Sequence, residues 1–272
     1  MVPKLLLIFF LLGIGLSYTT RYGGEIYQDG KYNKKIWFKG MKKKIVITGG
    51  TGRLGNELKK VKTNYKLFFP TKKKLDILKI NTVRNFLKKT RPNFIIHLAG
   101  LSRPMKEHEK NIKKSISLNI IGTANLVSVC SEMKIKLIYL STSYIYMGTK
   151  GNYKETDPLL PWNNYGWSKL GGECSVHMYK NSLIIRASIT QRPFVHKKAF
   201  GNVKINFMYQ DEAAKIIFKL INKKGVINLG GKAQTIFNFA KKNNPKVKKI
   251  STRNKLFPNN LTMNLGKLKK II

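Results

Sequence analysis

The sequence is poor in acidic side chains and in cysteine. It holds 12 Asp and Glu residues against 53 Lys and Arg residues, so its formal net charge is +41 over 272 residues. The two cysteines, Cys130 and Cys174, are too few for a disulfide framework or a cysteine-based zinc site. The four histidines are isolated from one another. We therefore expect a protein of a reducing compartment and predict no metal site.

Arginine is scarce within the basic residues. Eight arginines leave 45 lysines, which are spread along the whole chain. Nucleic-acid-binding modules usually gather their cations in one stripe and interleave them with aromatic side chains. We predict no specific nucleic-acid partner. Whether the lysine content serves a function or reflects a coding bias stays open.

Residues 5–20 contain no charged side chain, and the run from Leu5 to Leu12 is continuously apolar. The stretch is short for a membrane-spanning helix and has the length of a signal-peptide core. It is a signal, an uncleaved anchor or an extension ahead of a start at Met41. Cations are more frequent after the stretch than before it, so an anchor would leave the remainder in the cytoplasm. We expect a cytoplasmic protein with a membrane contact through residues 5–20.

After residue 41, apolar runs alternate with helical patterns. The runs predict strands near 44–48, 65–69, 94–98, 137–141 and 183–186. One long helix is expected from about 110 to 133. This alternation predicts an α/β fold with a doubly wound parallel sheet, whose ligands bind at the carboxyl ends of the strands. After Arg186 the pattern loosens, and we expect a small C-terminal substrate lobe there.

A glycine-rich turn joins the first predicted strand to its helix. Residues 48–55 read TGGTGRLG, with glycines three apart at 49, 52 and 55. Such a turn lets a pyrophosphate approach the amino terminus of the helix. We predict a dinucleotide cofactor bound by Gly49, Thr51, Gly52, Arg53, Leu54 and Gly55.

No carboxylate follows the second predicted strand, where a site specific for NAD would hold the ribose 2′-hydroxyl. Three lysines stand there instead, at 72–74. Lys72 and Arg53 can neutralise a 2′-phosphate, so NADP(H) is the preferred cofactor and NAD(H) the alternative. A solvated run of charge is the competing interpretation. Asp76, followed by Ile77, can accept a hydrogen bond from the adenine amino group.

Tyr165 and Lys169 are four residues apart in a predicted helix and therefore share one face. The ammonium group can lower the pKa of the phenol and hold the nicotinamide ribose, while the phenol exchanges a proton with a substrate oxygen. Thr142 lies in the Ser-Thr-Ser segment that ends the preceding strand. A hydroxyl at this edge of the sheet can bond the same oxygen.

Further segments accompany these motifs: HLAG at 97–100, NIIGTANL at 119–126, STSYIY at 141–146, YGWSKLGGE at 165–173, INLGG at 227–231 and LTMNL at 261–265. Together with the glycine turn they resemble the extended short-chain dehydrogenase/reductases. Within that superfamily the chain is most similar to the dTDP-4-dehydrorhamnose reductase (RmlD-like) group of nucleotide-sugar reductases. The resemblance is good from residue 41 to about 186 and loose beyond.

The resemblance implies a catalytic set of Thr142, Tyr165 and Lys169. It also implies that Ala99 and Gly100 line the nicotinamide and that Asn119 is structural. Ser143 is a departure, because the reductase group usually has aspartate there; we keep it as a candidate substrate residue. Nucleotide-sugar 4,6-dehydratases carry an Asp-Glu acid/base pair after the threonine, which serine and tyrosine cannot replace, so a dehydratase is not expected.

Two further polar segments are candidates for substrate binding. Ser102 and Arg103 follow the strand at 94–98, where Arg103 can contact sugar or phosphate. His196, with two lysines after it, can bind a diphosphate from the C-terminal lobe. For both segments, exposed basic surface is the alternative interpretation.

The resemblance therefore predicts an NADPH-dependent reductase of a nucleotide-linked 4-keto-6-deoxy sugar, in sugar-nucleotide or surface polysaccharide biosynthesis. The alternatives are a nucleotide-sugar epimerase that retains its NAD(P) and a non-catalytic NADP-binding regulatory subunit. The expected partner is a nucleotide sugar, and a homodimer is a possible assembly. The expected divisions are an apolar segment and linker at 1–40, an NAD(P)-binding Rossmann domain at 41–186, and a substrate lobe with returning Rossmann elements at 187–272.

Overall fold

The computed structural model describes residues 27–28, 31–32, 42–252 and 258–272. The chain separates into two units, Met1–Lys42 and Lys43–Ile272. In the first unit, the described residues form two short antiparallel strands, β1 (Tyr27–Gln28) and β2 (Lys31–Tyr32). The predicted divisions at residues 40 and 186 stay predictions.

The predicted localisation, with a membrane contact through residues 5–20, is wrong. In the part of the chain that the structure describes, no helix has the length and apolar character needed to cross a membrane. Residues 5–20, on which the prediction rested, lie outside that part.

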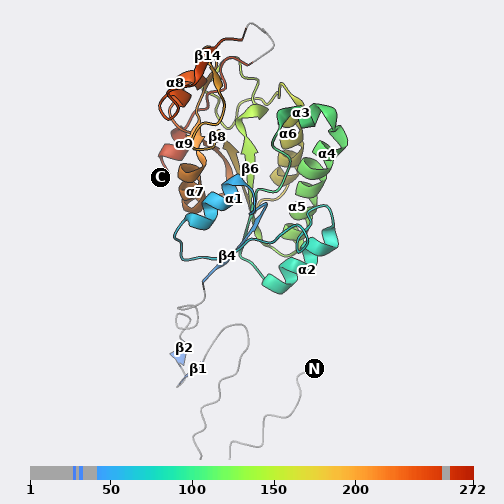
Figure 1. The fold of residues 1–272 in the computed structure, drawn as a ribbon. Coiled ribbons are helices and arrows are strands. Elements are labelled where there is room, and N and C mark those ends of the chain that lie inside the picture. Colours follow the sequence, from blue (N-terminus) through green and yellow to red (C-terminus); the bar gives the residue numbers. More distant parts are fainter. Residues whose placement is uncertain (1–26, 29–30, 33–41, 253–257) are drawn as a thin grey trace, which may run out of the picture. The chain divides into compact units, whose positions relative to one another are not determined.

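A six-stranded sheet forms the centre of the second unit (Figure 1). Its strands are β3 (Lys44–Thr48), β4 (Lys66–Phe68), β5 (Phe94–His97), β6 (Lys136–Thr142), β7 (Ser182–Ala187) and β12 (Gly225–Leu229). Their order is β12-β7-β6-β5-β3-β4, and every neighbouring pair is parallel. This confirms the predicted α/β Rossmann fold. The order reverses between β3 and β5, so the carboxyl ends of these two strands flank the crevice where such sheets bind ligands.

Helices cover both faces of the sheet (Figure 1). One face carries α1 (Arg53–Lys60), α7 (Gln210–Leu220) and α9 (Gly266–Lys269). The other carries α2 (Ile80–Thr90), α5 (Gly122–Glu132) and α6 (Asn164–His177). The sheet is thus the middle of three layers.

Successive side chains of the strands point to opposite faces of the sheet. Ile45 and Ile47 belong to a core cluster with Leu58 of α1, whereas Val46 belongs to a second cluster with Val83 of α2. Because helices cover both faces, β3 is apolar along most of its length instead of alternating apolar with polar residues.

The single helix expected over 110–133 is divided into three pieces. After α3 (Met105–Lys110), the chain forms α4 (Ile112–Ile116), a π-helical turn, η1 (Ser117–Ile121), and then α5. The π-helical turn carries the buried Asn119, whose amide donates a hydrogen bond to the Ser168 hydroxyl at 2.8 Å. The irregular turn therefore coincides with a polar link to α6.

The described segment after β7 also forms short strand pairs and one further helix. β8 (Ile189–Thr190) pairs with β11 (Met208–Tyr209), and β9 (Lys198–Phe200) with β14 (Lys248–Ile250), both in parallel. β10 (Lys204–Ile205) pairs antiparallel with β13 (Gln234–Thr235), which precedes α8 (Ile236–Lys241). A separate apolar cluster that includes Phe194, Tyr209 and Phe239 holds this lobe together.

Candidate functional site

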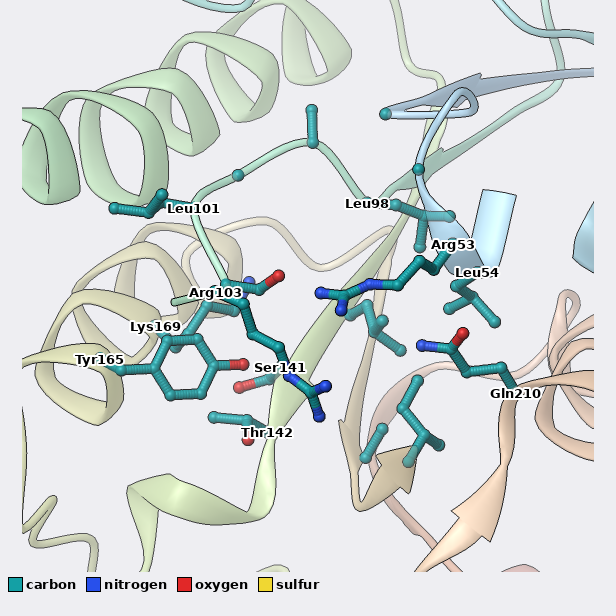
Figure 2. A pocket seen from close by; sticks show the side chains of 18 of the residues that line it. Arg53, Leu54, Leu98, Leu101, Arg103, Ser141, Thr142, Tyr165, Lys169 and Gln210 are labelled. Carbon is teal, nitrogen blue, oxygen red and sulfur yellow. The ribbon is translucent and has the colours of Figure 1, made fainter. Parts of the chain in front are cut away.

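A cavity of about 450 Å³ opens at the carboxyl ends of β3, β5 and β6. It is lined by the glycine turn after β3, the loop after β5, the end of β6, one face of α6 and the segment after β7. These segments are far apart in the sequence, and the parallel sheet brings them together. Figure 2 shows side chains of this cavity.

The glycine turn fits the backbone of the neighbouring loop closely. Gly49 has φ +68°, and a Cβ atom there would lie 2.6 Å from the backbone nitrogen of Ala99. A Cβ atom on Gly55 would meet the backbone of Gly50 at 2.6 Å. Any larger residue at either position would push the helix or the loop away. The two glycines thus allow α1 to start directly at the cavity.

The amino terminus of α1 has no side-chain cap. Gly52 is the N-cap residue, and no side chain accepts a hydrogen bond from the first turn of the helix. The first N–H groups of a helix need acceptors, and they carry a partial positive charge. An anionic group in the cavity satisfies both requirements, which is how helix termini bind pyrophosphates.

Tyr165 reaches the cavity from the first turn of α6 (Figure 2). Asn163 caps this helix, since its side chain accepts from the backbone N–H of Gly166 at 2.8 Å. The rings of Tyr144 and His108 pack edge-on against the Tyr165 ring, with centroids 5.8 and 5.1 Å away. The phenol is therefore held in place from two sides.

Burial raises the pKa of Tyr165 to about 12, although a hydrogen bond with Thr142 acts in the opposite direction. Thr142 ends β6, and its hydroxyl oxygen also accepts from the backbone N–H of Tyr144 at 3.3 Å. The raised pKa differs from the lowering expected from the sequence, because removal from water outweighs the cationic neighbours. Tyr165 therefore holds its proton at neutral pH.

Lys169 lies one turn further along α6, and its side chain also lines the cavity. Its Nζ lies 4.1 Å from the centroid of the Tyr139 ring. Burial lowers the pKa of Lys169 to about 7, against an opposing effect of the Glu173 carboxylate. At pH 7, the Lys169 side chain therefore exists in similar amounts as the charged ammonium group and the neutral amine.

His97, at the end of β5, is a buried histidine of the sheet. One ring nitrogen lies 2.7 Å from the hydroxyl of Thr48, and the other lies 3.1 Å from the hydroxyl of Thr123. Burial and the charge of Lys169 lower the pKa of His97 to about 3, so the imidazole is neutral.

Among the residues that the structure describes, no group of three His, Cys, Asp or Glu could hold a metal ion.

Three cations line the cavity, Arg53, Arg103 and Lys169, and none of the described lining residues is acidic. Figure 2 shows the guanidinium groups of Arg53 and Arg103 in the cavity near the Tyr165 hydroxyl. Arg53 donates to the side-chain oxygen of Gln191 at 3.1 Å. Burial, together with the charge of Arg103, lowers the pKa of Arg53. Two guanidinium groups that repel each other in this way make a site for an anion.

The cavity gathers most of the residues predicted from the sequence: Gly49, Thr51, Gly52, Arg53, Leu54, Gly55, Ala99, Gly100, Ser102, Arg103, Thr142, Tyr165 and Lys169. No role was predicted from the sequence for the following lining residues: Leu101, Met105, Tyr144, Ser188, Phe207 and Gln210. Tyr144 lies two residues after the predicted Thr142 and could have been found from its position, and Ser141 belongs to the segment already indicated by the sequence. The residues after β7 carry no motif, and only the fold places them.

Three predicted cofactor residues lie outside this cavity. Lys72 is exposed in the turn region after β4. Asp76 accepts from the backbone N–H of Leu78 at 3.0 Å, so its carboxylate already stabilises a turn. Ile77 is buried in the core beneath α5. Their roles toward adenosine stay predictions.

Two predicted substrate residues also lie outside the cavity. Ser143 is fully buried, and its hydroxyl has no hydrogen-bond partner within the described structure. His196 is exposed, and its ring packs edge-on against Phe194 with centroids 5.4 Å apart. Partial burial of the ring and the charge of Arg103 lower the pKa of His196. Both substrate roles stay predictions.

Known proteins share this fold and parts of this sequence. A dTDP-4-dehydrorhamnose reductase from Aggregatibacter actinomycetemcomitans is 30% identical over 152 residues, which cover 54% of this chain and 51% of the relative. A methionine adenosyltransferase 2 subunit beta from Danio rerio is 32% identical over 161 residues, covering 56% of this chain and 46% of the relative. The chain thus spans about half the length of these relatives.

A solved structure gives a likeness over most of the chain. The dTDP-4-dehydrorhamnose reductase from Bacillus anthracis str. Ames, in complex with NADP, superposes with a TM-score of 0.77 at 25% identity, covering 85% of this chain and 92% of that chain. The sequence profile described as "RmlD substrate binding domain" matches residues 43–217. That match contains the glycine turn, the Thr142, Tyr165 and Lys169 set and the cavity that joins them, and it confirms the resemblance seen in the sequence. The chain belongs to the RmlD substrate binding domain family.

Proposed function

We propose that this protein is an NADPH-dependent reductase of a nucleotide-linked 4-keto-6-deoxy sugar. The observation that carries the proposal is one cavity in which Thr142, Tyr165 and Lys169 face the uncapped amino terminus of α1. The reductase relatives support the proposal.

The residues present fit a dinucleotide cofactor. The turn at Gly49 leaves no room for a side chain, and the helix that follows offers free N–H groups to a pyrophosphate. The three cations of the cavity, with no acidic lining residue in the described structure, suit the negative charge of such a cofactor. Preference for NADPH is supported by the lysines at 72–74 and by the NADP in the Bacillus anthracis relative.

The roles of the side chains follow from their positions. When bound, NADPH supplies the hydride that reduces the substrate carbonyl. Tyr165 gives the proton of its hydroxyl to the carbonyl oxygen, and its high pKa keeps that proton available at neutral pH. Thr142 holds the same oxygen through a hydrogen bond. The charge of Lys169 stabilises the tyrosinate that remains after the proton has left.

Arg103 supports an anionic substrate. Its guanidinium group lies in the cavity near the Tyr165 hydroxyl (Figure 2). A nucleotide-linked sugar brings a diphosphate, which can take up this charge. A neutral carbonyl compound would leave Arg103 and Arg53 in mutual repulsion.

The test is NADPH oxidation with a panel of 4-keto-6-deoxy sugars linked to dTDP, UDP or GDP, and with one free 4-keto sugar as the control. We expect at least one nucleotide-linked substrate to be reduced. The free sugar should react far more slowly, because it cannot bind the arginines. NADPH binding without reduction of any nucleotide-linked substrate would contradict the proposal.

A non-catalytic subunit is the second candidate, because relatives named methionine adenosyltransferase 2 subunit beta match the chain. Under this alternative the protein binds NADPH, reduces nothing in the panel and forms a complex with a methionine adenosyltransferase. Size-exclusion chromatography of the two proteins together distinguishes the candidates. An epimerase, the third reading, would convert a nucleotide sugar without net consumption of NADPH.

A further inference from the structure

Glu173 lies one turn beyond Lys169 on the same face of α6, in a row with Tyr165 and His177 at intervals of four residues. Its side chain is fully buried, unlike those of the acidic residues in the exposed ion pairs of this chain. An acidic residue at such a position requires partners that offset the free-energy cost of its desolvation. The structure supplies them from three elements.

The Glu173 carboxylate has a partner on each oxygen. Oε1 accepts from Arg186 of β7, at 2.7 Å from Nη2 and 3.0 Å from Nε, and lies 3.3 Å from Nε2 of His177. Oε2 accepts from the hydroxyl of Ser141 of β6 at 2.5 Å. Burial by itself would raise the pKa of Glu173, but these hydrogen bonds and the charge of Arg186 hold it below its usual range. The carboxylate is therefore ionised.

Arg186 is fixed in turn from its other side. Its Nη1 donates to the Tyr146 hydroxyl and to the backbone carbonyl of Glu155, both at 2.9 Å. The charge of Glu173 raises the pKa of Arg186 against the effect of burial. Apolar residues of equal volume often stabilise a protein as much as a buried ion pair does, or more. Stability alone therefore gives little reason for this pair.

The pair stands directly beneath the cavity. Ser141, which donates to Glu173, is itself a lining residue of the cavity beside Thr142. Lys169 faces the Tyr139 ring of β6 and the neutral His97 of β5, and neither carries a negative charge. Glu173 is the carboxylate whose charge acts on Lys169.

We propose that Glu173 is a positioning residue of this site: its buried carboxylate, fixed by Arg186 and Ser141, keeps the Lys169 ammonium group charged so that it can act on cofactor and on Tyr165. The action of Lys169 on Tyr165 rests on the proposed function, whereas its action on cofactor rests only on cofactor binding in this cavity. Glu173 does not touch substrate, since it lies under the cavity wall. It acts through Lys169.

The test is Glu173→Gln in the full chain, with NADPH binding and NADPH oxidation each measured from pH 5 to about pH 10. Without the carboxylate, Lys169 loses its proton at a lower pH. The alkaline limb of the binding profile, over which NADPH affinity falls as the pH rises, should therefore move down by at least about one pH unit. Below that limb the NADPH affinity should stay within about two-fold of wild type. The matched control is Glu132→Gln, which makes the same chemical change in an exposed pair with Arg84 and should leave the limb in place.

Glu173→Gln leaves Arg186 without its carboxylate, so a second variant guards against loss of the fold. In Glu173→Gln with Arg186→Met, both charges of the pair are removed, and a smaller downward shift is expected, because loss of the Arg186 cation partly offsets loss of the carboxylate. A limb at the wild-type pH in either folded variant would overturn the inference. If the shift is seen in NADPH binding but no panel substrate is reduced by the wild type, the role of Glu173 stands and the proposed reductase function fails.

Discussion

The side-chain amide of Asn119 and the backbone of Leu101 form a two-way pair: Oδ1 accepts from the Leu101 N–H at 2.7 Å, and Nδ2 donates to the Leu101 carbonyl at 2.9 Å. Leu101 belongs to the loop after β5, which also carries Gly100 and Arg103 into the cavity. Since Nδ2 also donates to Ser168 of α6, one side chain fixes the loop to the helix that bears Tyr165.

Asn119→Ala should therefore lower the free energy of unfolding by about 1–3 kcal/mol, because it leaves two part-buried backbone groups of Leu101 without their side-chain partners. It should also weaken NADPH binding, since the loop beside the cavity is released. Urea unfolding and a fluorescence titration measure the two effects. The control Asn238→Ala, at an exposed position, should change stability by less than about 0.5 kcal/mol. An equally small change in Asn119→Ala would contradict the assigned role.

Patterns within short segments predicted much of this molecule. The apolar runs located β3, β5, β6 and β7, and the spacing of Tyr165 and Lys169 placed both on one face of α6 and in one cavity. These features depend on residues close in sequence, whose periodicity is visible without the fold.

Features that depend on distant segments could not be read in this way. The helix expected over 110–133 is broken by the π-helical turn at Asn119, whose partners stand 18 and 49 residues away. The raised pKa of Tyr165 comes from burial by the Tyr144 and His108 rings and other neighbours, which no local pattern indicates. The buried pair of Glu173 and Arg186 requires knowing that α6 packs against β7.

Tyr165→Phe tests the proton donor. The variant keeps the ring that packs against Tyr144 and His108, so folding and NADPH affinity should stay close to wild type. Turnover of the panel substrate should fall about 100-fold to 10,000-fold, because the proton is no longer supplied. Stopped-flow oxidation of NADPH and a binding titration separate the two properties. Turnover near the wild-type rate would remove Tyr165 from the proposed mechanism.

Lys72 and Arg53 should differ in what they recognise. Arg53 reaches the cavity that is proposed to hold the pyrophosphate of either cofactor, so Arg53→Gln should weaken the binding of both NADPH and NADH. Lys72 is exposed in the turn region after β4, so Lys72→Gln should raise the Kd for NADPH about five-fold to ten-fold and leave the Kd for NADH unchanged.

Titration calorimetry at two salt concentrations measures this preference, and the gap between NADPH and NADH should narrow at high salt. Lys110→Gln, another exposed lysine, is the control and should alter neither affinity. An unchanged preference in Lys72→Gln would assign the 2′-phosphate to other residues.

The last prediction concerns the cost of burying Lys169. Its pKa is about 7 in the folded chain because of burial, against a usual value of 10.5. Below pH 7 both the folded and the unfolded chain carry the charge, and the folded chain bears the full desolvation cost. As the pH rises from 7 to 10.5, the folded chain releases this proton first, so the wild type gains stability relative to a variant without the charge.

Lys169→Met should therefore have a higher Tm than wild type at pH 6, by an amount that shrinks as the pH approaches 10. Thermal unfolding across this range measures the difference, and Lys180→Met, at an exposed position, should show no such trend. A difference that stays constant with pH would show that Lys169 keeps its ordinary pKa in the folded protein.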